Sequence, residues 1–196
     1  MKRNRVMKNF RQTSTALRAL LVLTIVLGMG YPLAITVLGQ LALPTQSNGS
    51  LVYRDGSPIG SSLLGQSFAT AEGAAMPGFF QSRPSAAGDG YDGGASSGSN
   101  YGPENEDLIA AIEEREGSTP DALTASGSGL DPHISPENAL SQVAAVAAAR
   151  GLNESVVREL VESRIQGRDL GYLGEPRVNV LDLNVSLAEL DSSASD

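Results

Sequence analysis

The chain has 196 residues, neither cysteine nor tryptophan, and a formal net charge of −8. The charges are unevenly placed: residues 1–18 carry six basic and no acidic side chains, whereas residues 19–196 carry 22 acidic side chains against eight arginines. A domain this acidic lacks the basic surface that nucleic-acid binding needs. The absence of cysteine excludes disulfides, thiolate metal sites and cysteine nucleophiles.

An uncharged, mostly apolar run at residues 19–43 follows the basic leader at 1–18. An α-helix needs about 20 apolar residues to cross the roughly 30 Å hydrocarbon core of a bilayer. The run therefore predicts one transmembrane helix. Its basic flank predicts a cytoplasmic N-terminus, which leaves the bulk of the chain extracytoplasmic. The alternative is a cleaved secretory signal, cut for example after Gly39, but such signals have apolar cores of only about 7–15 residues.

Small residues and a proline interrupt this run. Pro32 predicts a kink supported by a neighbouring helix, because backbone groups that face lipid must be hydrogen-bonded. Small residues also let helices approach closely. The alternative is purely compositional, since Gly and Pro are commoner in membrane helices than in soluble ones. The candidate contacts with another membrane helix are Gly28, Gly30, Tyr31 and Pro32.

Residues 44–190 have the pattern of a single α+β domain with a small sheet and several helices, followed by a polar tail at 191–196. Asp55-Gly56 between two short apolar runs predicts a β-hairpin. Residues 85–103 are rich in Gly, Ser and Ala and predict a long loop, which in a compact domain is usually functional or disordered. The expected strands are 50–53, 58–60, 63–68 and 177–183.

Two consecutive helices are predicted to form a hairpin. Ser135 and Pro136 are a favourable cap and first residue for the first helix, and Gly151 is a typical stop. Asn153 caps the second helix, which should end at Gly167. An earlier helix is expected between residues 103 and 117, and a turn at 120–123. The apolar stripes of the hairpin are Leu140, Val143, Val146 and Ala147, then Val156, Val157, Leu160, Val161 and Ile165.

The segment from Thr124 to Pro136 contains the only histidine, His133, close to Asp131, Ser126 and Ser128. A serine hydrolase needs Ser, His and usually a carboxylate together in space, so a hydrolase interpretation depends on His133. The surrounding Gly-Ser-Gly does not fit the Gly-x-Ser-x-Gly elbow. The simpler interpretation is a Gly-rich loop that leads into a capped helix. The hydrogen-bond donors of such a loop can bind the backbone of a partner protein.

Three other kinds of site have little or no support in the sequence. Asp131, His133 and Glu137 are three potential metal ligands without a recognised spacing. The Ser-Gly-Ser-Gly run lacks the Gly-Lys-Ser/Thr that phosphate cradling requires. The acidic stretches at 103–107 and 113–116 could attract cations, but acids near a helix start more often interact with the helix dipole.

An ordered series of short segments resembles the C subunit of the bacterial Kdp potassium-transporting ATPase, the KdpC family. The series extends through most of the chain and includes the single N-terminal span. Its segments are 16–18, 30–33, 49–52, 65–68, 80–86, 98–103, 126–136, 142–143, 149–150 and 174–181.

The resemblance implies a non-catalytic subunit of an inner-membrane complex that uses ATP, Mg and potassium. Its partners would be a channel-like A subunit, a P-type ATPase B subunit and a small F subunit. The family's C subunit is needed for assembly, and is proposed either to raise the ATP affinity of the B subunit or to cover the ion entrance. No firmly bound cofactor and no catalytic residue are expected in this chain itself.

The candidate partner-contact loop comprises Ser126, Ser128, Asp131 and His133. The sequence departs from the family pattern at 93–100, where a shorter Gly-Gly-Ser-Asn is expected, and at Tyr101, where Leu is expected. The alternatives to the resemblance are a membrane-anchored serine hydrolase and a stand-alone tethered binding module.

Overall fold

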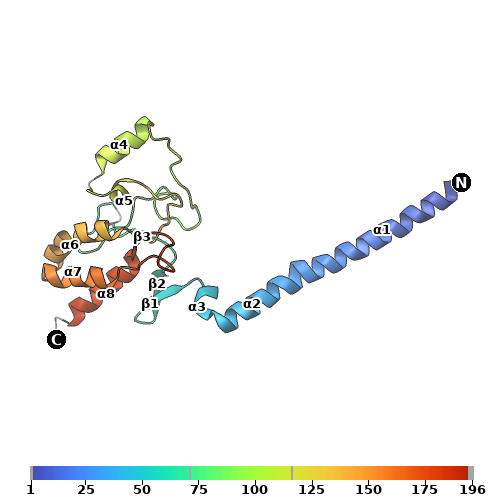
Figure 1. Cartoon of the computed structure of the whole chain (residues 1–196), viewed down its shortest axis with the longest axis horizontal. Helices are drawn as coiled ribbons and strands as arrows, with labels where there is room; N and C mark the ends of the chain where they lie inside the picture. Colours follow the sequence, from blue (N-terminus) through green and yellow to red (C-terminus); the bar gives the residue numbers. More distant parts are fainter. Residues whose placement is uncertain (1, 71, 116, 194–196) are drawn as a thin grey trace. The chain divides into compact units, whose positions relative to one another are not determined.

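The computed structural model describes residues 2–70, 72–115 and 117–193. It contains two compact units, Met1–Ser50 and Leu51–Asp196, here called unit 1 and unit 2. The order of their elements along the chain can be followed by colour in Figure 1.

Unit 1 is mainly helical. Helix α1 (Lys2–Ile25), the π-helical turn η1 (Val26–Gly30) and helix α2 (Tyr31–Ala42) follow one another without a break. Their stretch Arg11–Ala42 is long and apolar enough to cross a membrane, and it is the one such helix in the described part of the chain. The single-span prediction is thereby confirmed.

The π turn lies directly before the proline of the span. The backbone N–H of Tyr31 donates to the carbonyl of Val26, five residues earlier instead of four. Pro32 has no N–H to donate, and local π adjustment is one way in which a membrane helix satisfies the backbone around a proline. The chain therefore stays helical through Pro32.

A short helix, α3 (Pro44–Ser47), closes unit 1 and folds back against the end of α2. The side-chain amides of Gln40 and Asn48 bond each other in both directions, at 3.1 and 3.3 Å. The N–H of Ser50 donates to the carbonyl of Thr45 at 2.9 Å. The exit from the long helix is thus a compact turn.

Unit 2 begins with the predicted hairpin, formed by β1 (Leu51–Arg54) and β2 (Ser57–Ser61). Asp55 and Gly56 both have positive φ, 51° and 76°, as the tightest hairpin turn requires. Residues 63–68, expected to extend this sheet, form a turn and irregular chain instead. That prediction was wrong because the chain turns directly after β2: the N–H of Leu64 donates to the carbonyl of Ser61 at 3.2 Å, and the side chains of Leu63 and Leu64 are exposed.

The middle of unit 2 is mostly irregular, with α4 (Glu106–Glu114) and α5 (Pro120–Leu123) as its helices. Residues 85–103 form a long loop, as expected. Asn105 caps α4 by accepting the N–H groups of Asp107 and Leu108.

The helical hairpin is confirmed as α6 (Pro136–Arg150) and α7 (Glu154–Ser163), which lie side by side. Ser135 and Asn153 cap them with their side-chain oxygens, and Gly151 ends α6 at φ 66°. Helix α7 stops before the predicted Gly167.

The expected strand 177–183 is only partly a strand. Strand β4 (Val178–Asn179) pairs antiparallel with β3 (His133–Ile134), and the chain then turns into helix α8 (Val180–Ser193). The Val- and Leu-rich residues 178–183 suggested a strand, but Asn179 caps the helix by accepting the N–H of Asp182. The helix places Leu183 and Leu187, one turn apart, in the core.

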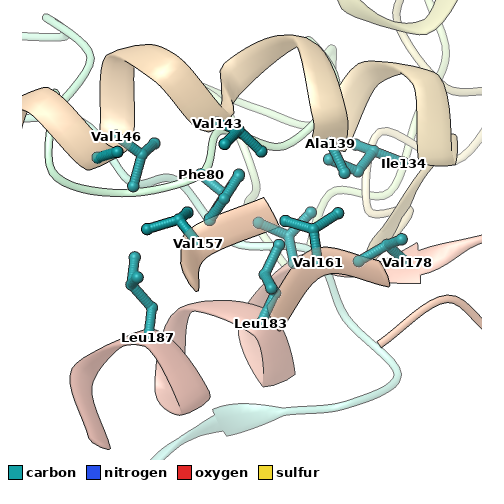
Figure 2. Packing of buried hydrophobic residues seen from close by; sticks show 12 residues of the cluster. Phe80, Ile134, Ala139, Val143, Val146, Val157, Val161, Val178, Leu183 and Leu187 are labelled. Carbon is teal, nitrogen blue, oxygen red and sulfur yellow. The ribbon is translucent and has the colours of Figure 1, made fainter. Parts of the chain in front are cut away.

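Helices α6, α7 and α8 enclose the main hydrophobic core of unit 2 (Figure 2). Aliphatic side chains dominate it, as a sequence without tryptophan requires. Phe80, which enters from the irregular region, is fully buried between the helices. The labelled core residues are Phe80, Ile134, Ala139, Val143, Val146, Val157, Val161, Val178, Leu183 and Leu187.

Candidate functional site: a braced Gly-Ser loop

The four predicted contact residues lie in the segment 126–133, here called the braced loop, which leads from α5 into β3, and the irregular segment before α5 holds it in place. Ser126 is buried and Ser128 is exposed. The carbonyl of Ser128 accepts the N–H of Ser97 at 3.0 Å and the hydroxyl of Ser96 at 2.9 Å. The loop conformation is therefore fixed by contacts with residues about 30 positions earlier.

Gly129 makes this close approach feasible. It has φ 68°, and a Cβ there would lie 2.6 Å from the carbonyl oxygen of Ser97 and 2.8 Å from the nitrogen of Ala87. The hydroxyl of Ser85 donates to the carbonyl of Gly129 at 2.6 Å. Only glycine combines this backbone conformation with such backbone contacts.

Asp131 is the centre of a charged group that joins the loop to Arg83. Its carboxylate accepts the N–H of His133 at 3.0 Å and lies 3.5 Å from both the His133 Nδ1 and an Arg83 nitrogen. Burial alone would raise the pKa of Asp131, but the bonds from His133 and the charge of Arg83 outweigh it and lower that pKa. Asp131 thus stays ionised and holds the turn.

Arg83 was not among the predicted site residues, although it lies within the 80–86 segment of the resemblance. Its guanidinium reaches the carbonyls of Thr124 at 3.3 Å and Ala125 at 3.4 Å just before the loop and the Asp131 carboxylate towards its end, so it bridges the two ends. The hydroxyl of Tyr91 donates to the Arg83 carbonyl. Burial raises the pKa of Tyr91 to about 12, so this donor keeps its proton.

Asp121 of α5, which precedes the loop, is hydrogen-bonded to the start of α6. Its carboxylate accepts the N–H of Ser135 at 2.7 Å and the hydroxyl of Ser135 at 3.1 Å. Burial opposes ionisation, but these bonds prevail and lower the pKa of Asp121. The same Ser135 hydroxyl accepts the N–H of Asn138, so the helix cap is itself fixed.

A pocket of about 400 Å³ opens beside this group. Its walls combine carboxylates, guanidinium groups and the imidazole, so it offers polar contacts of both signs. Its lining residues are Arg83, Asp121, Asp131, His133, Ile134, Ser135, Glu175, Pro176 and Arg177.

The geometry does not assemble a hydrolase or a metal centre. Among the described residues, neither Ser126 nor Ser128 hydrogen-bonds to His133, and the Ser128 hydroxyl instead accepts the N–H of Leu130 at 3.1 Å. No group of three His, Asp or Glu side chains able to hold a metal ion occurs within the described part of the chain, and Glu137 is exposed. The arrangement suits a rigid contact surface better than a reaction centre.

The predicted membrane-helix contacts lie together at the π turn. Gly28 and Gly30 belong to η1, and Tyr31 and Pro32 begin α2. A Cβ at Gly28 or Gly30 would come no closer than 3.9 or 3.7 Å to other atoms. The helix itself therefore does not require glycine there, and contact with a neighbouring helix stays a prediction.

Comparison with known proteins covers nearly the whole chain. Residues 13–189 match the family model described as K+-transporting ATPase, c chain. Three of the similar proteins carry the name potassium-transporting ATPase KdpC subunit. They come from Kineococcus radiotolerans (53% identical; 90% of this chain and 93% of that protein), Methylococcus capsulatus (50%; 89% and 96%) and Mycobacterium bovis (49%; 92% and 99%).

Several segments of the predicted resemblance belong to the geometry described above: 80–86 supplies Arg83, 126–136 contains the braced loop, and 174–181 contains β4. The resemblance identified from these short segments is confirmed by a match over residues 13–189 and by relatives at about half identity. On this evidence the chain belongs to the KdpC family.

Proposed function

We propose that this chain is the accessory C subunit of an ATP-driven potassium-uptake complex in the cell inner membrane. The observation that supports it is the family match over residues 13–189, combined with a single helix able to span the membrane. The proposed partners are the channel-like A subunit, the P-type ATPase B subunit and the small F subunit. ATP, Mg and potassium would be handled by those partners, and this chain would supply no catalytic residue.

The proposed orientation has the N-terminus in the cytoplasm and unit 2 outside. The six basic residues within 1–18 support it, because basic residues near a span resist translocation. Since the chain has no cysteine, single-cysteine variants report orientation directly. We expect an impermeant maleimide to label Ser99→Cys in intact cells, and Gln12→Cys only after permeabilisation. The reverse pattern would overturn this orientation.

Unit 2 would then act as a cap over the external potassium entrance and help the complex to assemble. With unit 2 outside and ATP inside, an effect on the ATP affinity of the B subunit would have to pass through membrane helices. The acidic balance of unit 2 also suits a cap, because its summed field weakly favours cations. The braced loop at Ser126–His133 is the proposed contact with the partner.

The first experiment is co-purification in mild detergent through a tag after Asp196. A multi-span protein, a P-type ATPase and potassium-stimulated ATP hydrolysis should come with the chain. Recovery of the chain alone would contradict the subunit function. It would instead favour the alternative interpretations, a tethered binding module or a membrane-anchored hydrolase. Failure of a fluorophosphonate probe to label Ser126 or Ser128 would then count against the hydrolase.

A matched pair of variants tests the loop contact. Gly127 and Gly102 are both exposed, with no positive φ, and a Cβ at either would meet nothing within 4 Å. Gly127→Lys should lower recovery of the complex, or its apparent potassium affinity, by about tenfold if the loop is a buried contact. Gly102→Lys should leave both unchanged. If the two variants behave equally, the loop is not part of the contact with the partner.

A further inference from the structure

Four exposed apolar side chains are concentrated where unit 2 begins, and we call them the hairpin patch. Leu51 and Tyr53 on β1 are 42% and 59% exposed, and Leu63 and Leu64 after β2 are 60% and 44% exposed. The strand register pairs Leu51 with Ser61, whose hydroxyl accepts the N–H of Leu63 at 3.1 Å. Leu63 therefore lies at the same end of the hairpin as Leu51, the end at which the chain enters unit 2.

This entry point is close to the end of the membrane helix along the chain. The apolar run ends at Leu43, and the chain after it does not extend away: the N–H of Ser50 bonds to the carbonyl of Thr45 at 2.9 Å. The Gln40–Asn48 amide pair closes the same turn. Since Leu51 follows Ser50 directly, β1 starts near the membrane boundary in whatever direction unit 2 faces.

The hairpin carries little charge, although unit 2 as a whole is strongly acidic. Residues 51–68 carry one arginine and one acidic residue, whereas residues 69–196 carry 21 acidic residues and seven arginines. Anionic lipid surfaces attract basic and repel acidic segments. The hairpin, with its charges balanced, can therefore approach a bilayer without this electrostatic penalty.

We propose that the hairpin patch rests in the headgroup–acyl boundary of the same membrane that the helix of unit 1 spans. Tyrosine is enriched at this depth because its ring is apolar and its hydroxyl can stay hydrated. Leucines beside it would gain by leaving water. Arg54 pairs only loosely with Asp55, at 3.9 Å, and can therefore reach a lipid phosphate. The contact would hold the start of unit 2 on the membrane surface.

This inference goes beyond the proposed function, since it requires a membrane-spanning unit 1 but no particular transport complex. The absence of tryptophan from the chain provides the test, because Tyr53→Trp creates a single tryptophan in the full-length protein, whose fluorescence can be excited without exciting the tyrosines. The protein would be reconstituted in phosphatidylcholine–phosphatidylglycerol vesicles with or without brominated acyl chains. We expect blue-shifted emission and about twofold quenching by the brominated lipid.

Two further single-tryptophan proteins serve as controls. Tyr31→Trp, inside the span, should be quenched, and failure there would show that unit 1 does not cross the bilayer. Tyr101→Trp, exposed in the long loop, should be unquenched. The proposal fails if Tyr53→Trp is unquenched, or if Tyr101→Trp is quenched equally, because lipid contact would then not be specific to the hairpin.

The same measurement on the co-purified complex separates lipid from protein contact. Quenching of Tyr53→Trp in the reconstituted complex supports the proposal. Blue-shifted emission that brominated lipid does not quench would mean that a partner subunit covers the patch, which overturns it. If no complex forms, the potassium function fails, and the vesicle experiment on the chain alone still decides the lipid contact.

Discussion

The helical and the irregular regions of unit 2 reach a defined conformation by different means. The region from His133 to Leu190 buries aliphatic side chains between α6, α7 and α8. The region from Ser62 to Pro132 has little regular structure and relies on bonds between side chains and backbone, such as Ser85 to Gly129 and Arg83 to Ala125. The stability of the helical region therefore depends on how well side-chain volume fills the core. The stability of the irregular region depends instead on the position of single polar atoms and on close backbone approach.

Two amides join the regions. Asn184 of α8 accepts the N–H of Phe80 and donates to the carbonyl of the same residue, both at 2.9 Å. Gln142 of α6 makes the equivalent pair of bonds with Gln81, at 2.7 and 3.2 Å. The backbone N–H and C=O groups of Phe80 and Gln81 are thus paired as they would be in a β-sheet, but their partners are side-chain amides of the helices.

The largest effect is expected in the helical core. Leu183 is fully buried, so Leu183→Ala should lower the free energy of unfolding by about 2–5 kcal/mol. Leu183→Met, which nearly conserves volume, should cost less than about 1.5 kcal/mol. Urea titration of the full chain in detergent, followed by far-ultraviolet circular dichroism, gives both values. Similar losses for the two variants would contradict a volume-limited core.

The second prediction breaks the link between the regions. Asn184→Leu removes both partners of Phe80 and leaves its buried N–H and C=O unpaired, at about 1–3 kcal/mol for each group. Hydrogen exchange at the Phe80 amide should accelerate more than exchange within α7. Unchanged protection of that amide would show that Asn184 does not hold the irregular chain.

The third prediction measures how much the close backbone contacts at Gly129 contribute to the need for glycine there. Gly129 and Gly151 have nearly the same positive φ, 68° and 66°, but only Gly129 has backbone atoms where a Cβ would lie. Both Ala variants carry the strain of a left-handed residue, and Gly129→Ala should cost about 1–3 kcal/mol more because of the overlap. Urea midpoints of the two variants measure this difference. Equal losses of stability in the two variants would mean that the loop backbone shifts to accommodate the Cβ without loss of free energy.

The smallest effect is a change in acid sensitivity. The pKa of Asp121 is lower in the folded state, so its ionised form stabilises the fold above the unfolded value of about 3.9, and this contribution is lost as the pH falls below it. When the pH is lowered from 6 to below about 4, the free energy of unfolding of Asp121→Asn should therefore fall less than that of the parent protein. A parallel pH dependence for the two proteins would contradict this role.

The helical hairpin was predictable because its signals are local. Ser135, Asn153 and Gly151 are standard cap and stop residues, and apolar side chains recur at helical spacing between them. Helix α8 was misread because Val and Leu dominate residues 178–183, with only Asn179 and Asp182 between them. Asn179 as a cap, with Leu183 and Leu187 four residues apart, would have been the opposing signal.

The braced loop was only partly predictable, because its conformation depends on distant partners. The sequence drew attention to Asp131 and His133, and the structure brings these two together with Arg83. Arg83 has no local signal, since its bonds to Thr124 and Ala125 cross about 40 residues. The fold of the helical region follows from periodicity, whereas that of the loop follows from pairings that no single segment encodes.

The π turn at Val26–Gly30 changes the rotational phase of the membrane helix. A turn closed by a bond from Tyr31 to Val26 accommodates one residue more than an α-helical turn does, and each residue rotates the helix by about 100°. A stripe of side chains that faces one neighbour before Ile25 therefore continues on a different side after Tyr31. The span can present two separate faces, at two depths of the bilayer, to two different neighbouring helices.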